Sequence, residues 1–130
     1  MPHHLLLCDD EVHIVRAAEI KLTRAGYEVR TASDGQEAWE AILERCPDML
    51  ITDCQMPRLD GFGLIERIRN SPEYAHLNIL MLTAKGFEMA HRDITGKWGL
   101  VAIMAKPFSP RELLKYVEQT LATPAGTTAE

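Results

Sequence analysis

Short apolar runs in this sequence end in side chains that could carry out chemistry. These are the carboxylates of Asp9, Asp10 and Asp53, the hydroxyl of Thr83 and the ammonium of Lys106. A carboxylate at the end of an apolar run could cap a turn, bind a cation or act as a nucleophile, and it is costly to bury without a partner. If the three carboxylates meet, their like charges repel and a divalent cation relieves the repulsion. A small cation that keeps several waters, such as Mg²⁺, suits a site with few carboxylates.

The apolar runs that carry these side chains have the length and pattern of buried strands. Each is too short for a globular helix, and most are continuous rather than alternating, as in parallel strands that are covered on both faces. The runs occupy residues 4–8, 28–31, 49–52, 78–83 and 101–105. The sequence therefore predicts five strands.

Helical periodicity occupies the segments between the strands, where apolar residues recur on one face. The predicted faces are Ile14, Ala18, Leu22 and Ala25; Trp39, Ile42 and Cys46; Phe62, Ile65 and Ile68; and Leu114, Val117 and Leu121. The helix boundaries carry matching signals, namely capping boxes at Ser33 with Gln36 and at Ser109 with Glu112, a first-turn proline at Pro110 and a C-terminal glycine at Gly26.

The alternation of strands and helices predicts an α/β fold, a doubly wound five-stranded parallel sheet with helices on both faces. Ligands of such folds gather at the carboxyl ends of the strands. The five side chains named at the outset each follow or end a strand, so they should converge on one sheet edge. The expected site is a Mg²⁺ site with a lysine and a threonine beside it.

Each of these residues also has a purely structural interpretation. Asp9 and Asp10 could cap the helix that follows them, and residues 60–61, an Asp-Gly pair, read as a turn into the third helix. Thr83 could be an ordinary strand residue and Lys106 a solvated one. These interpretations would have to hold together at one sheet edge, which favours a functional site.

Composition indicates one soluble globular domain. The chain has 130 residues, is 46% hydrophobic and 25% charged, and carries a net charge of -5. No dense basic run favours nucleic-acid binding, and no apolar stretch approaches the roughly 20 residues that span a membrane. Three cysteines without metal-ligand spacing suggest reduced thiols in the cytoplasm. We expect a domain over residues 1–122 and a disordered tail or linker stub over residues 123–130.

Four motifs, in order, resemble the receiver domains of two-component response regulators, the CheY-like superfamily. They are LLLCDDE, ITDCQMPRLDG, MLTAKG and AKPFSPRELL, and the resemblance covers roughly residues 5–121. Each motif alone is weak, but all four stand at the end of a predicted strand. The resemblance implies the flavodoxin-like receiver fold, with strand order 2-1-3-4-5.

The resemblance also implies a role for each acidic residue. Asp53 would be the phosphoacceptor, which attacks a phosphohistidine on a sensor histidine kinase or a small phosphodonor. Asp10 and Asp53 would bind Mg²⁺ directly, together with the backbone carbonyl of Gln55, while Asp9 would act mainly through water. Such a chain is a signalling switch rather than an enzyme, although it phosphorylates itself from phosphodonors and loses the phosphoryl group to water.

Thr83 and Lys106 would bind the phosphoryl oxygens once the group has arrived. In receivers a cis peptide bond aims this lysine into the site, so the resemblance predicts that the Lys106–Pro107 bond is cis. The implied partners are a sensor histidine kinase or histidine phosphotransfer protein and a downstream effector protein or missing output domain. No direct contact with nucleic acid or membrane is expected.

Three alternatives remain from the sequence. A receiver-like interaction module would no longer take up phosphate, and a phosphorelay intermediate would pass the group on. A phosphatase of the haloacid-dehalogenase type also uses an aspartate nucleophile with Mg²⁺, but it needs a second aspartate two residues further on, where this chain has Gln55.

The chain departs from the receiver pattern at two positions. Ile103 stands where many receivers carry a switching tyrosine or phenylalanine, and Gly96 falls in the expected fourth helix. Glycine costs about 1 kcal/mol against alanine inside a helix. We therefore expect a weak fourth helix, with the signalling change centred on residues 85–99 rather than on an aromatic flip.

Overall fold

Strands and helices alternate along the chain in the computed structural model, which describes residues 2–83 and 98–121. The five strands are β1 (His4–Cys8), β2 (Glu28–Ala32), β3 (Met49–Asp53), β4 (Asn78–Thr83) and β5 (Ala102–Ala105). The helices of the described residues are α1 (Val12–Arg24), α2 (Gly35–Glu44), α3 (Gly61–Arg69) and α5 (Pro110–Leu121). Each predicted strand is present, with limits within one residue of the prediction.

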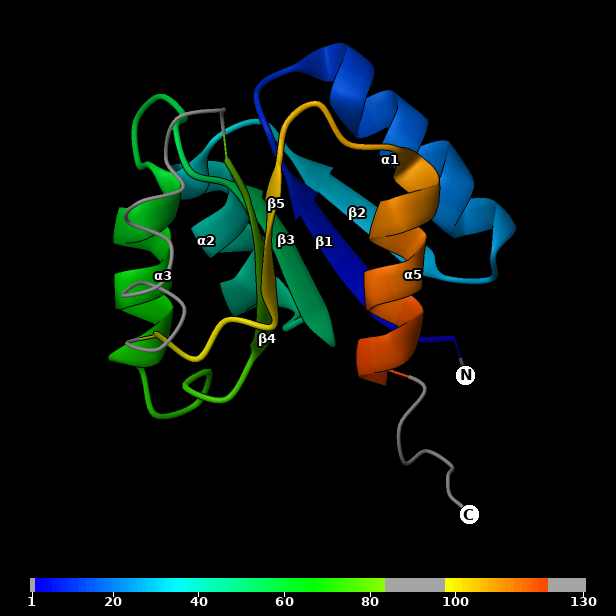
Figure 1. The fold of residues 1–130 in the computed structure, drawn as a ribbon. Coiled ribbons are helices and arrows are strands. Elements are labelled where there is room, and N and C mark those ends of the chain that lie inside the picture. The colour runs from blue at the N-terminus through cyan, green and yellow to red at the C-terminus, as the bar shows by residue number, and fades with distance from the viewer. Residues whose placement is uncertain (1, 84–97, 122–130) are drawn as a thin grey trace.

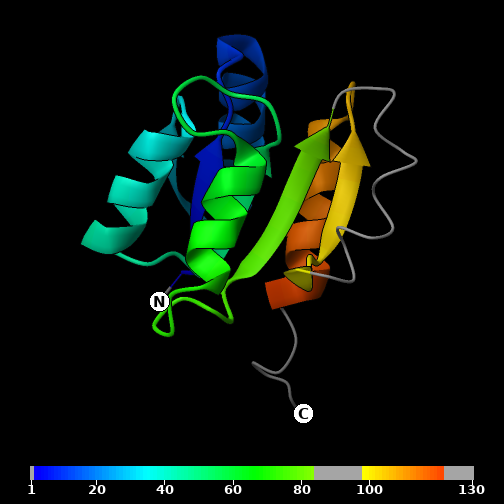
Figure 2. The same cartoon turned by 90° about the vertical axis from the view of Figure 1, so that its left-hand side faces the viewer.

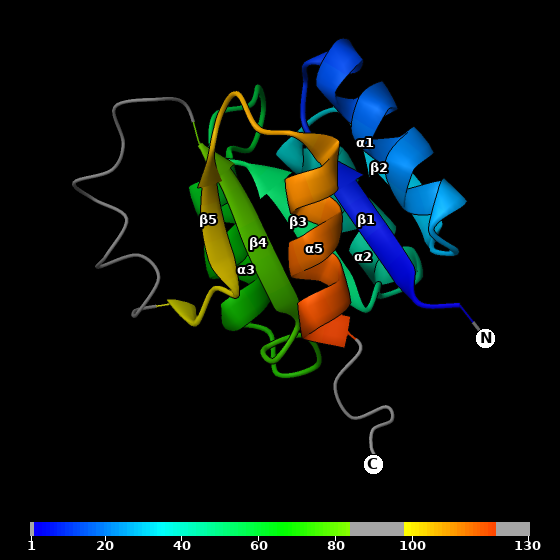
Figure 3. The same cartoon turned by 45° about the vertical axis from the view of Figure 1, so that its right-hand side comes forward.

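The strands form one parallel sheet in the order β2-β1-β3-β4-β5. Helices α1 and α5 cover one face of this sheet, and α2 and α3 cover the other (Figures 1 and 3). In the edge-on view, α5 and α3 lie on opposite sides of β4 (Figure 2). The doubly wound α/β fold and its strand order are as predicted.

The sheet has an apolar core on each face, which explains why apolar residues follow one another along the strands and do not alternate with polar ones. In β1, Leu5 and Leu7 pack into the core beneath α1 and α5, while Leu6 and Cys8 pack into the core beneath α2 and α3. All four side chains are fully buried. A strand in this position has no solvent-facing side, so apolar residues occupy both alternating sets of positions.

Helix boundaries follow the local signals, with one correction. Helix α5 begins at Pro110, and the predicted capping box of Ser109 and Glu112 is present: the Ser109 Oγ accepts from the Glu112 N–H at 3.0 Å. The cap of α2, however, is Asp34 rather than Ser33, because the Asp34 Oδ1 accepts from the Glu37 N–H at 2.8 Å.

The buried helix faces also differ in detail from the periodicity. The core-facing residues of α5 are Leu113, Val117 and Leu121, and Leu114 is only half-buried. Cys46 lies beyond the end of α2 and is exposed. Gly26 has φ +103° after the end of α1, which is the left-handed conformation that favours glycine at a helix C-terminus.

Two expectations fall outside the described residues. They are the fourth helix with Gly96 and the tail over residues 123–130. Within the described part of the chain, no helix combines the length and apolar character that crossing a membrane requires.

Candidate functional site

The carboxyl ends of β1 and β3 bring three carboxylates together at one edge of the sheet. One oxygen from each of Asp9, Asp10 and Asp53 lies within 4.8 Å of the other two. Asp9 and Asp53 are buried, whereas Asp10 is exposed at the start of the β1–α1 connection. This edge is the upper one in Figure 1, where β1 leads into α1 and β3 leads towards α3. The predicted convergence of the acidic residues is therefore present.

Lys106 lies among these carboxylates, directly after β5. Its Nζ is 3.2 Å from the Asp53 Oδ2 and 2.9 Å from the Asp9 Oδ2. A third carboxylate, that of Glu11, lies 2.6 Å from the same nitrogen. Burial alone would lower the pKa of the ammonium, but these carboxylates more than offset it and the pKa of Lys106 is raised. The lysine is therefore a fixed positive charge.

The backbone around Lys106 helps to place its side chain. The Lys106 N–H donates to the Thr83 carbonyl at 2.7 Å, which extends the pairing of β4 and β5 by one residue. The Lys106–Pro107 peptide bond is cis, as the sequence resemblance predicted.

Asp53 ends β3 with its two carboxylate oxygens in different environments. The Oδ1 accepts from the Cys54 N–H at 2.9 Å, and the Oδ2 faces Lys106. Burial and the negative charge of Asp9 raise the pKa of Asp53, while Lys106 and the Cys54 N–H act in the opposite direction. An additional cation beside Asp53 would favour its ionised form.

The two carboxylate oxygens of Asp9 face different groups. The Oδ1 accepts from the Glu11 N–H at 2.9 Å in the turn before α1, so Asp9 does not cap the helix itself. The residue in the N-cap position is Glu11, and it makes no capping bond with its own side chain. The Asp9 Oδ2 is buried and faces the Lys106 ammonium at 2.9 Å. A buried oxygen of this kind, beside two further carboxylates, fits a hard divalent cation or a water bound to one.

The β3–α3 connection, which carries Gln55, is tightly closed. Asp60 caps α3 by accepting from the Gly63 N–H at 2.8 Å, and the Gly61 N–H donates to the Cys54 carbonyl at 3.0 Å. A Cβ on Gly61 would lie 2.2 Å from the Asp53 carbonyl oxygen, so no larger residue fits there. The predicted turn at residues 60–61 thus also brings the loop back onto the end of β3.

Thr83 occupies the position expected from the sequence, buried at the end of β4. It pairs with Ala105 of β5, while its chain neighbour Leu82 pairs with Asp53 of β3. Thr83 therefore lies at the same sheet edge as Asp53 and Lys106.

Two features of the site were missed from the sequence. Glu11 contacts Lys106, and the acidic run at residues 9–11 was the available signal. Arg58, in the β3–α3 connection, forms an ion pair with Asp34 at 3.1 Å. Nothing in the spacing of these two residues indicates their contact, because it joins two separate loops.

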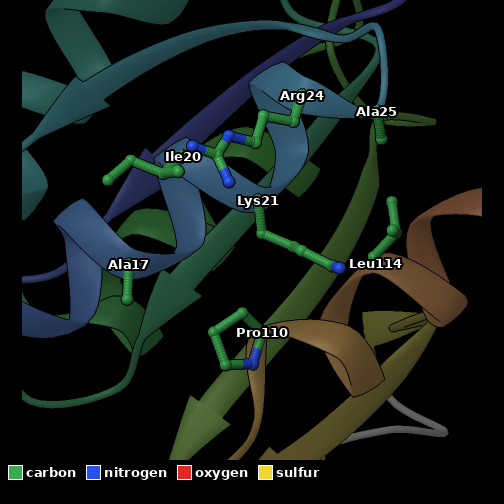
Figure 4. A pocket seen from close by; sticks show the side chains of 7 residues that line it. All are labelled: Ala17, Ile20, Lys21, Arg24, Ala25, Pro110 and Leu114. Atoms are coloured by element: carbon green, nitrogen blue, oxygen red, sulfur yellow. The ribbon is translucent and has the colours of Figure 1, made fainter.

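A groove of about 440 Å³ between α1 and α5 lies apart from this chemistry (Figure 4). Ile20, Pro110 and Leu114 line it, together with the cationic side chains of Lys21 and Arg24, and it contains no carboxylate. The Lys21 side chain extends from α1 towards α5. The groove lacks the residues for phosphoryl or metal chemistry, so the candidate site is the acidic sheet edge.

Known proteins resemble this chain in sequence over most of its length. Residues 5–118 match the family described as the response regulator receiver domain. The chain is 39% identical over 120 residues to the probable transcriptional regulator ycf27 of Cyanidium caldarium, covering 92% of this chain and 46% of that protein. It is 35% identical over 130 residues to the transcriptional regulatory protein SrrA of Staphylococcus aureus, covering 100% of this chain and 52% of that protein. The chain thus spans about half the length of the curated relatives it matches.

Solved structures show the same fold. The chemotaxis response regulator CheY4 of Vibrio cholerae superposes with a TM-score of 0.84 at 31% sequence identity, covering 93% of this chain and 100% of that one. The receiver domain of NtrX from Brucella abortus gives a TM-score of 0.81 at 30% identity, covering 92% and 98% of the two chains.

Proposed function

This chain belongs to the response regulator receiver domain family, and on that premise we propose that Asp53 accepts a phosphoryl group from a sensor histidine kinase. The family consists of signalling switches of two-component systems rather than enzymes that turn over a substrate. The observation that supports Asp53 most directly is its carboxylate, buried at a strand end, 3.2 Å from the Lys106 ammonium and beside Asp9 and Asp10.

In the proposed reaction, a carboxylate oxygen of Asp53 attacks phosphorus. The new P–O bond forms as the P–N bond of the phosphohistidine breaks, and the departing imidazole keeps the electron pair and takes up a proton. Phosphoryl transfer depends mainly on positioning and on neutralising charge, so a carboxylate is an adequate nucleophile. Lys106 is already placed to bind a phosphoryl oxygen with a small movement away from the Asp53 Oδ2.

Mg²⁺ fits the acidic residues, with Asp10, Asp53 and the Gln55 carbonyl as direct ligands and Asp9 acting through water. When bound, the ion would neutralise charge between the attacking carboxylate and the phosphoryl oxygens. Asp9 would orient such a water with its Oδ2, the buried oxygen that lies between Lys106 and the other two carboxylates. The Thr83 hydroxyl would donate a hydrogen bond to a phosphoryl oxygen. Because Thr83 is the last residue of β4, this bond would change the end of that strand when the chain is phosphorylated.

Relatives of this chain and its cysteines indicate which partners and which compartment it would have. The curated relatives named as transcriptional regulators are about twice as long as this chain, which supports an output domain or a separate effector as the receiver of the signal. A phosphorelay role, in which Asp53 passes the group to a histidine phosphotransfer protein, uses the same site. The three cysteines are free thiols, which supports a reducing, cytoplasmic location.

The test is to incubate the purified protein with acetyl phosphate, with and without Mg²⁺. We expect one hydroxylamine-labile phosphoryl group per chain, only with Mg²⁺, and none on the Asp53→Asn variant. The matched control is Asp48→Asn, which removes an exposed carboxylate elsewhere in the chain and should leave labelling intact. Phosphate release in many-fold excess over the chain during the labelling time, with no accumulated phosphoprotein, would indicate a phosphatase instead. Neither labelling nor phosphate release from the wild type would indicate an interaction module.

A further inference from the structure

We propose that the ion pair between Asp34 and Arg58 is a positioning device that holds the metal-binding loop in place. It joins the N-terminus of α2 to the β3–α3 connection, which carries Gln55. The inference rests on the proposed function, because Gln55 matters only if its carbonyl binds the cation. Neither residue touches the reacting atoms, so both would act through the loop backbone.

Asp34 serves two purposes with its two carboxylate oxygens. The Oδ1 caps α2 through the Glu37 N–H at 2.8 Å, and the Oδ2 faces the Arg58 Nε at 3.1 Å. The Asp34 side chain is only 12% exposed, whereas that of Arg58 is 57% exposed. The helix cap fixes the carboxylate, so Arg58 meets a partner that is already ordered.

Arg58 adopts a backbone conformation that few residues other than glycine adopt. Its φ is +69°, and it is the only non-glycine residue with positive φ in the described part of the chain. Such a conformation persists only where the surroundings hold it, and it often marks a functional loop. A backbone hydrogen bond closes the turn across Arg58, from the Leu59 N–H to the Pro57 carbonyl at 2.8 Å, and the ion pair with Asp34 is the side-chain contact made from this turn.

Two further contacts attach the same loop to the same helix terminus. A Cβ on Gly35 would lie 1.9 Å from the Leu59 carbonyl oxygen, so the two backbones are in direct contact. The Cys8 thiol lies 3.2 Å from the Met56 sulfur and 3.3 Å from the Asp34 carbonyl oxygen. Cys8 directly precedes Asp9, so the loop, the helix terminus and the end of β1 form one assembly.

The consequence for the cation follows from the type of ligand that Gln55 supplies. A main-chain carbonyl cannot be aimed by rotating a side chain, so its position depends on the loop backbone alone. Gly61 closes one end of the loop against Asp53, and the Asp34–Arg58 ion pair holds the middle. Without the ion pair the loop should sample positions in which the carbonyl is misplaced and the cation is bound less tightly.

The test is the affinity for Mg²⁺, measured by calorimetric titration of the whole 130-residue chain. Arg58→Ala should weaken binding by about three- to tenfold, the range for an ion pair that acts through a ligand's support. Arg58→Lys should recover most of the affinity. Asp34→Ser keeps a capping side chain but removes the charge, and should weaken binding to the same extent.

A double variant and a control separate this role from general stability. If the two residues act as a pair, combining Asp34→Ser with Arg58→Ala should cost no more affinity than either change alone. The control is Arg45→Ala, which breaks the ion pair with Glu28, 2.7 Å long, away from the loop. It should leave Mg²⁺ affinity unchanged whatever its effect on the melting temperature.

The outcomes also distinguish this inference from the proposed function. If wild-type protein binds no Mg²⁺, the proposed function itself fails. If the wild type binds Mg²⁺ and Arg58→Ala binds it equally well, the positioning role is wrong. It is also wrong if the losses of Mg²⁺ affinity in the two single variants add up in the double variant.

Discussion

Three carboxylates lie within 3.2 Å of the Lys106 ammonium, and a fourth, that of Asp10, lies beside them. One positive charge among four carboxylates leaves the site with excess negative charge, part of it on buried groups. Burial disfavours the charged form of Asp53, and the nearby negative charge of Asp9 repels it. Both effects raise the pKa of Asp53, although Lys106 acts in the opposite direction. The residues themselves therefore favour binding of a further cation.

At Gly61 the α3 backbone lies so close to the end of β3 that a side chain there should destabilise the fold. Gly61→Ala should destabilise the protein by about 2–4 kcal/mol, because the new methyl group would meet the Asp53 carbonyl oxygen, 2.2 Å from the Cβ position, and neither backbone can move freely. Urea unfolding measures the change.

Gly63, two residues along α3, provides the matched control. A Cβ there would meet the end of the flexible Leu59 side chain at 2.8 Å, which can move aside. Alanine also has the better helix propensity, by about 1 kcal/mol. Gly63→Ala should thus be neutral or stabilising, and equal losses from both substitutions would contradict this account of Gly61.

Among the elements, β1 and β2 are joined to the end of α2 by a buried histidine–arginine contact. The Arg30 Nε donates to the His4 Nε2 at 2.7 Å, and the Arg30 guanidinium also reaches the Ala41 carbonyl at 3.1 Å. His4 is only 3% exposed, and its other ring nitrogen is buried without a hydrogen bond among the described residues. The contact requires the neutral imidazole, since a protonated ring could not accept from Arg30.

This arrangement predicts that stability falls as the pH is lowered through the range where free histidine titrates. Burial lowers the pKa of His4, Arg30 and Arg45 lower it further, and Glu28 and Asp48 oppose them less strongly. Between the lowered pKa of His4 and the ordinary histidine value of 6.5, the unfolded chain therefore binds a proton that the folded chain does not bind. This contribution to stability is fully present above that window, declines as the pH falls through it by at most about 1.4 kcal/mol per pH unit, and changes no further below it.

Urea unfolding from pH 7.5 to 5 measures this dependence. Glutamine at position 4 can accept from Arg30 and does not titrate, so His4→Gln should flatten the pH dependence over this range. His76→Gln, at an exposed histidine, is the control and should keep the wild-type dependence. An unchanged slope in His4→Gln would show that other groups cause it.

Prediction of the elements from sequence succeeded where the signal is local. The strands of the sheet read as continuous apolar runs, and the Ser109 box needs only two residues three positions apart. At α2 two acceptors, Ser33 and Asp34, stand side by side, and local sequence could not choose between them. The Asp34–Arg58 and His4–Arg30 contacts join separate elements, so no periodicity reports them.

The candidate site was predictable for a different reason. The topology of a parallel sheet brings all strand ends to one edge, so the neighbours of Asp53 follow from strand order alone. Glu11 was missed because its contact depends on the reach of two side chains. Ile103 lies half-buried in β5 and packs against the core beneath α2 and α3; its effect on switching and the response of residues 85–99 stay predictions.

For the whole molecule, the important feature is that chemistry is concentrated at one end of a sheet whose two faces are both covered by apolar cores. The acidic cluster joins the ends of β1 and β3, which are adjacent strands at the centre of this sheet. A ligand that binds there binds only the folded chain, because the carboxylates do not meet in the unfolded one. Cation binding should therefore stabilise the entire domain.

The size of that stabilisation depends on how far the cation exceeds its dissociation constant. At ten times Kd, a ligand of the native state adds about 1.4 kcal/mol to the free energy of unfolding. We expect Mg²⁺ to raise the urea midpoint of the wild type accordingly, whereas NaCl at equal ionic strength should not. Asp10→Asn should be at least as stable as wild type without Mg²⁺, since it removes repulsion at an exposed position, and should gain nothing when Mg²⁺ is added. Glu73→Gln removes an exposed carboxylate from the α3–β4 connection, at the other end of the sheet, and should retain the full response. A Mg²⁺ response that survives Asp10→Asn would place the cation elsewhere on the molecule.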